Sequence, residues 1–289
     1  MTGLQSISAE ICSLICQDPI LERLDLNSIC FISHAFRNEA QRELSYRFPC
    51  VRGVHRAKAW CLSLQSRPRI AINVEGLVLL LPQPPALPEE HIERLTQALH
   101  MCVNLKELVV LFQERRLRLP GLQERKYSSS TRMLNDHPFK LTKFVNGYFS
   151  QRNAKFIAFL GSQPSLESLE LHSDDYKYFQ DIFFNLRHLK SLACPAQYLL
   201  HGSYGLKRQM RLRLDFKNPS DLYCYEINLK SLEILLLNRD KKLASLAIFS
   251  TQKLSHFPEI MGVIARSRIY VQHLEIHQFY PTQDRKSVV

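Results

Sequence analysis

Hydrophobic residues near the start of the chain recur at helical spacing. Ile7, Ile11, Leu14 and Ile15 lie three or four residues apart, which predicts one apolar face on a short helix. Ser8 stands just before this helix and is a suitable N-terminal cap. The pattern therefore predicts a helix whose apolar side needs a cover.

Two further short helices are expected before residue 48. Asp25 is the expected cap of the second, and the third spans about 33–44. The second helix is expected to carry the apolar residues Leu26, Ile29 and Ile32, and the third to have Phe36, Ala40 and Leu44 on one side. Three short helices in so few residues bury little surface by themselves, so either the rest of the chain or a partner must cover them.

From residue 69 onward the hydrophobic pattern changes to a recurring L-x-x-L-x-L unit. The last three apolar positions of each unit alternate, as in a strand with one buried face. Seven copies begin at Val74, Leu105, Leu166, Leu189, Leu229, Leu243 and Val271, and weaker copies begin at Leu141 and Leu212. The copies at Leu229 and Leu243 are so close together that a short loop is expected between them.

Amphipathic helices are expected between several of these strands. They begin near Pro88, Ser150, Ser173 and after His256. Alternating strands and helices predict an α/β fold with parallel strands, and a repeat of about 20–30 residues with this core is typical of leucine-rich repeats. The alternative, an open doubly wound sheet, usually has a Gly-rich turn after its first strand, and this chain with 9 Gly has none.

Composition changes along the chain suggest four parts: 1–48, a connecting segment 49–68, the repeats at 69–280 and a tail at 281–289. A short strand followed by a helix is expected in 49–68. The segment 113–137 is rich in charge and Ser and contains a Pro-Gly pair, so it is interpreted as a long, disordered surface loop.

The charge and the cysteines limit the possible functions. The net charge is +11, but the basic residues are spread along the chain, so nucleic-acid binding is not favoured. No phosphate-binding Gly loop, nucleophile elbow or His-Glu-x-x-His motif occurs, and the 8 Cys contain no Cys-x-x-Cys pair. We therefore expect no enzyme, no cofactor and no metal site.

The N-terminus shows no signal peptide and the apolar runs are short, which predicts no membrane span. Scattered cysteines among hydrophobic residues suggest free thiols in a reducing compartment. A cytoplasmic or nuclear location is expected.

The first 48 residues resemble an F-box, or F-box-like, domain. The motif residues are the run Ile7 to Ile11, the pair Asp25-Leu26, and the run Ile32 to Arg37, which ends in Phe-Arg. Ser8 stands where the family usually has Pro. The later repeats resemble the irregular leucine-rich repeats that often follow an F-box, a combination abundant in mushroom-forming fungi.

This resemblance implies that the helical module binds a Skp-type adaptor and, through it, a cullin. The chain would then be the substrate-recognition subunit of an SCF ubiquitin ligase. On this interpretation the adaptor-facing residues are Ile7, Ser8, Ile11, Leu14, Ile15, Leu26, Ile29 and Ile32.

An unknown substrate protein would contact exposed positions beside the strand leucines. The candidates for these exposed positions, chosen because apolar and polar residues alternate along the strands, are Lys106, Glu107, Glu167, Glu170, Arg187, Lys190, Glu233, His273 and Glu275. Two other hypotheses remain: a protein-binding repeat scaffold without a ligase role, and a basic nucleic-acid-binding protein. The ligase hypothesis requires the apolar residues of the first helices to stay uncovered by their own chain.

Overall fold

The computed structural model describes residues 7–82, 87–113, 130–150, 153–172, 186, 188–195, 211–216, 232, 245–250, 257–266 and 271–278. The chain divides into two compact units, Met1–Leu141 and Thr142–Val289. Each unit is an arrangement of helices and parallel strands, so the α/β prediction is confirmed.

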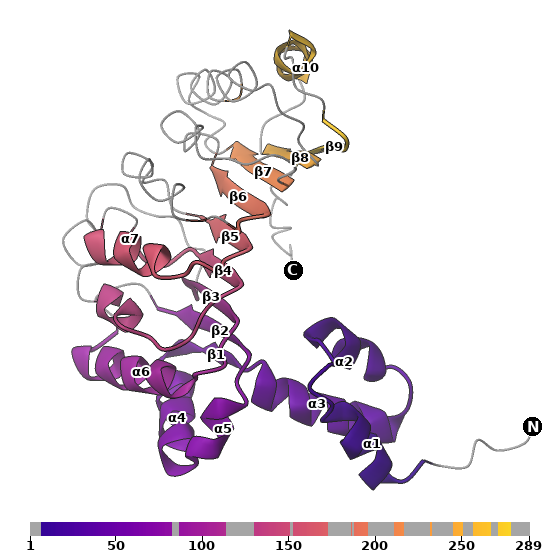
Figure 1. Ribbon diagram of the computed structural model, residues 1–289, viewed down its shortest axis with the longest axis vertical. Coiled ribbons are helices and arrows are strands. Elements are labelled where there is room, and N and C mark those ends of the chain that lie inside the picture. Colours follow the sequence, from indigo (N-terminus) through magenta and orange to yellow (C-terminus); the bar gives the residue numbers. More distant parts are fainter. Residues whose placement is uncertain are drawn as a thin grey trace, which may run out of the picture. The chain divides into compact units, whose positions relative to one another are not determined.

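The first unit begins with three short helices that pack together (Figure 1). They are α1 (Ala9–Cys16), α2 (Arg23–Ile29) and α3 (His34–Arg47). The caps follow from the sequence: Ser8 Oγ accepts a hydrogen bond from the Ile11 amide (3.4 Å), and Ser33 Oγ accepts one from the Phe36 amide (3.3 Å).

The predicted cap of α2 was wrong. Glu22 occupies the N-cap position, and Asp25 lies in the first turn, where its carboxylate accepts the Glu22 amide at 2.9 Å. An acidic residue three positions after the cap satisfies a backbone donor in a capping box, so Asp25 still stabilises the start of this helix.

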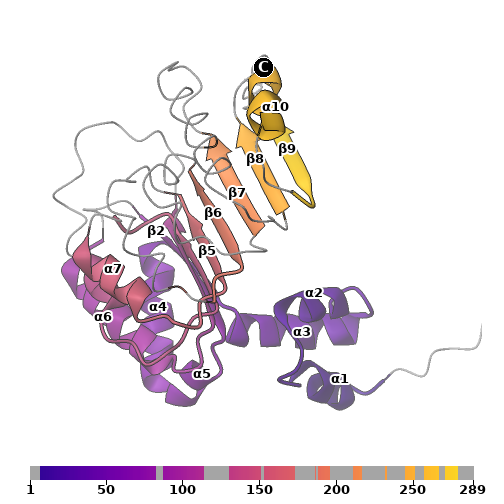
Figure 2. The ribbon, with the colours of Figure 1, turned by 45° about the horizontal axis from the view of Figure 1, so that its top comes forward.

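Three parallel strands follow in the first unit. They are β1 (Cys50–Arg52), β2 (Gly76–Leu81) and β3 (Glu107–Phe112), and β2 pairs with both of the others. Helices α4 (Gly53–Ser66), α5 (Pro68–Ile72) and α6 (Glu89–Met101) lie on one side of these strands (Figure 2). The strand and helix expected in 49–68 are therefore present, and β1 makes this segment part of the sheet.

Every second residue along β2 and β3 points into the hydrophobic core of this unit. Leu77, Leu79 and Leu81 of β2 are buried, as are Leu108 and Val110 of β3. On α6, Ile92, Leu95 and Leu99 are buried, and so is Cys102 just after it. The strand face and the helix stripe together form the interior of this unit.

The segment predicted as a disordered loop is partly ordered. Ser130–Leu134 forms a 3-10 helix, and Thr131, Met133 and Leu134 are buried. The apolar Met-Leu pair explains this correction, because the charged residues around it concealed a short stretch that packs on α6. Residues 114–129 lie outside the described residues.

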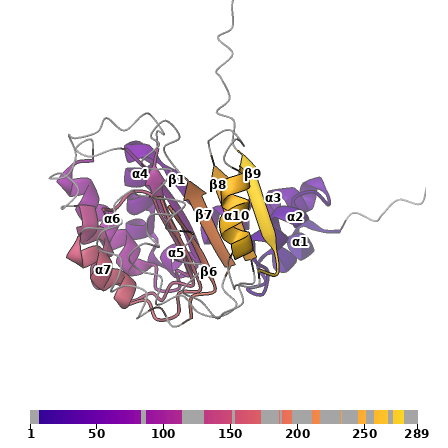
Figure 3. The same ribbon diagram turned by 90° about the horizontal axis from the view of Figure 1, so that it is seen from above.

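The described residues of the second unit form six parallel strands in chain order. They are β4 (Lys143–Asn146), β5 (Ser168–Leu171), β6 (Ser191–Pro195), β7 (Arg211–Phe216), β8 (Ser245–Ser250) and β9 (Leu274–Gln278). Helix α7 (Ala154–Gly161) contributes Phe156 and Phe159, whose rings contact Phe144. Helix α10 (Phe257–Arg266) lies beside β8 and β9 (Figure 3). Strands that follow chain order within each unit exclude the doubly wound order for that unit.

Two predictions for this unit were wrong. The cap of α7 is Asn153, whose Oδ1 accepts the Lys155 amide at 2.9 Å, and not Ser150. Leu232 was expected in a strand, but its backbone is helical, and β7 pairs directly with β8. The helix expected from Ser173 lies outside the described residues.

A backbone brace recurs at the start of successive strands. The Glu75 carbonyl accepts the amides of Lys106 and Glu107 at 2.7 and 3.0 Å. The Thr142 carbonyl accepts those of Glu167 and Ser168 at 2.8 and 2.9 Å. The Glu167 carbonyl accepts those of Lys190 and Ser191 at 2.7 and 2.9 Å. Sequentially ordered parallel strands with a recurring brace give each unit a solenoid-like character.

Candidate functional site: an exposed apolar surface on the N-terminal helices

The N-terminal helices α1–α3 enclose a small core of their own. Its buried members are Cys12, Cys16, Leu26, Phe36 and Ala40. Partly buried neighbours, among them Leu21, Ile29, Leu44 and Phe48, pack around it. This core uses only one side of α1 and one side of α2.

The other side of α1 is apolar and faces solvent. Ile7, Ile11, Leu14 and Ile15 are each 41–69% exposed, whereas Cys12 and Cys16 are fully buried. Cysteines four residues apart define the inner side, so residues 7, 11, 14 and 15 fall on the outer side. The predicted apolar face exists, and the described residues of this unit leave it exposed.

The turn before α2, the outer side of α2 and the turn after it add four apolar side chains. Ile20, Leu24, Phe31 and Ile32 are 65–84% exposed. Leu24 was absent from the predicted site, although its spacing of two from Leu26 places the two residues on opposite sides of a helix. Ile20 and Phe31 lie in turns, where helical periodicity gives no signal.

Two predicted adaptor-facing residues lie elsewhere. Leu26 is fully buried in the core of the helices, which corrects its assignment to an exposed surface. Ile29 is partly buried and packs on the same core. Ser8 is exposed and caps α1 beside the apolar side chains.

We call these eight residues, Ile7, Ile11, Leu14, Ile15, Ile20, Leu24, Phe31 and Ile32, the N-terminal apolar surface. Elsewhere in the described residues only Tyr46, Leu62, Ile72 and Val103 are large, hydrophobic and exposed. Covering one such side chain completely contributes about 1.5–3 kcal/mol. Exposed apolar groups gathered in one small module mark an interaction site, whereas single ones are ordinary.

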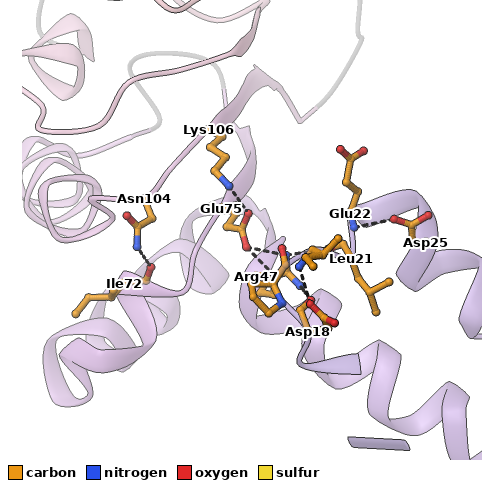
Figure 4. A network of polar contacts seen from close by, with 11 residues as sticks. Asp18, Leu21, Glu22, Asp25, Arg47, Ile72, Glu75, Asn104 and Lys106 are labelled. Carbon is orange, nitrogen blue, oxygen red and sulfur yellow. Dashed lines mark hydrogen bonds and ion pairs between the residues drawn. The ribbon is translucent and has the colours of Figure 1, made fainter. Parts of the chain in front are cut away.

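The buried Arg47 connects the N-terminal helices to the strands (Figure 4). Its Nε and Nη2 lie 2.8 and 2.7 Å from Glu75 Oε1. Its Nη1 and Nη2 also donate to the carbonyls of Asp18 and Leu21, at 3.2 and 2.9 Å. Arg47 thus joins the turn between α1 and α2 to the residue before β2.

Several predicted substrate-binding residues pair within the chain. Lys106 Nζ lies 2.9 Å from Glu75 Oε2, and Lys190 Nζ lies 2.8 Å from Glu167 Oε1. Both pairs join the residues before two adjacent strands, where the backbone braces also lie. His273 pairs with Glu275 at 2.7 Å. Glu75 is only 18% exposed, but the other groups of these pairs are exposed. Pairs between exposed groups stabilise little and can exchange for contacts with a partner.

Glu170 has the most elaborate surroundings of the predicted set. His172 Nε2 lies 3.0 Å from its carboxylate and Arg213 Nη1 lies 3.8 Å away. The hydrogen bond from His172 is the main reason why the pKa of Glu170 is lowered, and Arg213 and Lys143 contribute, while partial burial opposes them.

Glu107 begins β3 opposite Gly76, and Arg187 and Glu233 lie outside the described residues. The predicted substrate residues therefore divide between the first unit, with Lys106 and Glu107, and the second unit.

Among the described residues, no three His, Cys, Asp or Glu side chains lie close enough together to hold a metal ion. Seven described cysteines are free thiols, and burial raises the pKa of Cys61 to about 11 and that of Cys102 to about 12. Thiols with raised pKa values are poor nucleophiles at neutral pH.

Within the described ranges, no helix combines the length and apolar character that crossing a membrane requires. No protein-family model matches the sequence, and no curated protein matches it significantly. The N-terminal apolar surface and the strand-edge ion pairs are therefore the observations from which a function can be argued.

Proposed function

We propose that this chain is the non-catalytic substrate-recognition subunit of an SCF-type ubiquitin ligase. The N-terminal helices would act as an F-box-like module that binds a Skp-type adaptor, and the degenerate leucine-rich repeats would bind the substrate protein. The N-terminal apolar surface is the single observation that carries this proposal. A site of this kind gains its affinity from clustered apolar groups that lose water when a partner covers them.

The placement of the core supports this division of roles. Cys12, Cys16 and Leu26 hold the helices together from inside, so the outer residues Ile11 and Leu14 are not needed for folding. Arg47 and its carbonyl partners hold the same helices against the first strands. A partner that binds the helices would therefore also be connected to the repeats.

Co-expression of the full chain with a Skp-type adaptor tests the proposal. We expect a stable complex, and we expect Ile11→Glu with Leu14→Glu to weaken it by at least about tenfold, because two buried charges replace two apolar contacts. Leu62→Glu with Val103→Glu is the matched control, since these side chains are also exposed but lie outside the N-terminal helices.

The result has two informative alternatives. If the wild-type chain forms no adaptor complex, the ligase proposal is withdrawn. If it captures other proteins through the repeats without any adaptor, the chain is a protein-binding scaffold, the other interpretation that the repeat pattern supports.

A further inference from the structure

A second surface of the first unit carries an unbalanced charge. Between Glu43 and Glu75 the sequence contains no acidic residue but six basic ones. Arg47 is buried, and the other five are exposed. We call these five the α4–α5 basic surface: Arg52, Arg56, Lys58, Arg67 and Arg69. They lie at the start of α4, along it, and at the start of α5.

These five cations differ from other basic residues of the same unit. Arg42, Arg94, Lys106 and Arg132 each form an ion pair with a carboxylate. Among the residues that the structure describes, no carboxylate pairs with any member of the α4–α5 basic surface. Their positive charge is therefore available to a partner, and it is not neutralised by the first unit's described side chains.

Exposed apolar side chains lie among these cations. Leu62, Ile72 and Val103 are each 45–48% exposed. Leu62 follows Lys58 by four residues on α4, and Ile72 follows Arg69 by three on α5, so each apolar side chain has a cation as its helical neighbour.

Val103 belongs to the same end of the unit. The side chain of Asn104 donates to the Ile72 carbonyl at 2.9 Å, which joins the turn after α6 to the end of α5 (Figure 4). The basic surface thus has apolar positions along it and at its end.

We infer that the α4–α5 basic surface binds an acidic segment of a partner protein that also carries apolar side chains. The five cations, which pair with no carboxylate of the described residues, favour an anionic partner, and Leu62, Ile72 and Val103 favour one with apolar groups. Protein interfaces combine a hydrophobic centre with a charged rim. A nucleic-acid backbone, by contrast, offers phosphates, which make no favourable contact with exposed Leu or Ile. This inference is independent of adaptor binding, which concerns the N-terminal apolar surface.

Fluorescence anisotropy with the full chain tests the inference. The probes are a labelled peptide of glutamate and leucine, a polyglutamate of the same length, and a DNA duplex of similar charge. We expect the mixed peptide to bind most tightly. Arg67→Glu with Arg69→Glu should weaken its binding by about tenfold, because two attractions become repulsions.

The control pair is Arg23→Glu with Lys155→Glu, which changes the net charge equally at exposed positions outside this surface. This control should keep nearly wild-type binding. Leu62→Ser with Ile72→Ser should weaken binding of the mixed peptide but not binding of polyglutamate or DNA. Thermal unfolding and the far-UV circular dichroism spectrum of each variant show whether the fold is kept.

Three results would overturn the inference. One is no binding of the mixed peptide at low salt. Another is an equal loss of binding in the control pair, which would reduce the effect to net charge. The last is DNA binding that exceeds peptide binding and is lost in Arg67→Glu with Arg69→Glu, which would make this a nucleic-acid surface.

Discussion

Gly76, the first residue of β2, lies against the ring of Phe48 at the end of α3. A Cβ atom at this position would lie 2.6 Å from Cδ1 of the Phe48 ring. Phe48 itself packs against the core of the N-terminal helices, so it has little room to move. A side chain at residue 76 would therefore push the helices away from β2.

We predict that Gly76→Ala lowers the free energy of unfolding by about 1–3 kcal/mol because of this overlap. Denaturant unfolding followed by circular dichroism measures it. Gly262→Ala is the control: its Cβ would meet only Arg266 Nη1, at 3.6 Å, inside α10. That change should raise stability by about 0.5–1 kcal/mol, because alanine is the better helix former. Equal effects at the two positions would contradict the packing argument.

His137 gives the first unit a pH dependence. Its ring stacks on Phe139 and lies next to His100, with centroid distances of 4.7 and 4.4 Å. Burial lowers the pKa of His137 to about 4, with a smaller contribution from His100, whereas the Met133 carbonyl and Asp136 oppose this.

The folded chain therefore keeps His137 neutral between pH 6.5 and about 4, while the unfolded chain takes up a proton there. The contribution of neutral His137 to the free energy of unfolding is fully present above pH 6.5. We predict that protonation of His137 in the unfolded chain lowers the free energy of unfolding by about 3 kcal/mol as the pH falls to 4. Unfolding free energies of wild type and His137→Phe at several pH values check this. The variant should lose less stability on acidification, and parallel curves would disprove the assignment.

At the scale of elements, one buried cation organises the junction between α3 and β2. Arg47 ends α3, and it donates to Glu75 and to three backbone carbonyls of the turn between α1 and α2. The guanidinium carbon of Arg47 lies 5.5 Å from the centroid of the Phe48 ring. Glu75 also pairs with Lys106, so a series of paired charges lies along the starts of the first strands.

We predict that Arg47→Ala lowers the free energy of unfolding by about 3–5 kcal/mol, because it leaves Glu75 and the carbonyls without their donor. Hydrogen exchange should show faster exchange at Leu21, whose amide bonds the Asp18 carbonyl. Arg42→Ala removes a half-exposed cation that pairs with Glu39 and donates to Ser13, and it should cost less than about 1 kcal/mol. A loss of similar size in both variants would show that Arg47 is no more than a surface charge.

Periodicity alone was enough to place most elements. The L-x-x-L-x-L units at Leu105 and Leu166 became β3 and β5, because alternating leucines with one buried face have few other arrangements. The unit at Leu229 failed, because its leucines fit a helix as well as a strand and Leu232 is helical. The 3-10 helix at Ser130–Leu134 was missed because it is too short to show a period.

The candidate site was predicted in part for the same reason. The outer side of α1 was recognised, since four apolar residues at helical spacing define it. Leu26 was misplaced because its apolar character fits the inside of a helix as well as the outside. Exposure in turns, as at Phe31, depends on the three-dimensional path of the chain and has no periodic signal.

For the molecule as a whole, the N-terminal apolar surface predicts behaviour in the absence of a partner. We expect the purified chain to self-associate as its concentration rises, and Leu14→Glu with Phe31→Glu to reduce this association. Sedimentation velocity measures it. Stability should change by no more than about 0.5 kcal/mol, because both side chains are exposed. If the chain stays monomeric at all concentrations, these residues do not promote self-association and the prediction is wrong.

The backbone brace at the strand starts has a consequence for how such a chain can change over generations. It uses only main-chain atoms, so the brace itself does not depend on which side chain stands at Thr142 or Glu167. The paired residues Ser191 and Arg211 lie 20 positions apart, whereas Arg211 and Ser245 lie 34 apart. Insertions and deletions in the intervening stretches would therefore leave strand alignment intact, and lineages could remodel what the array presents while keeping its framework.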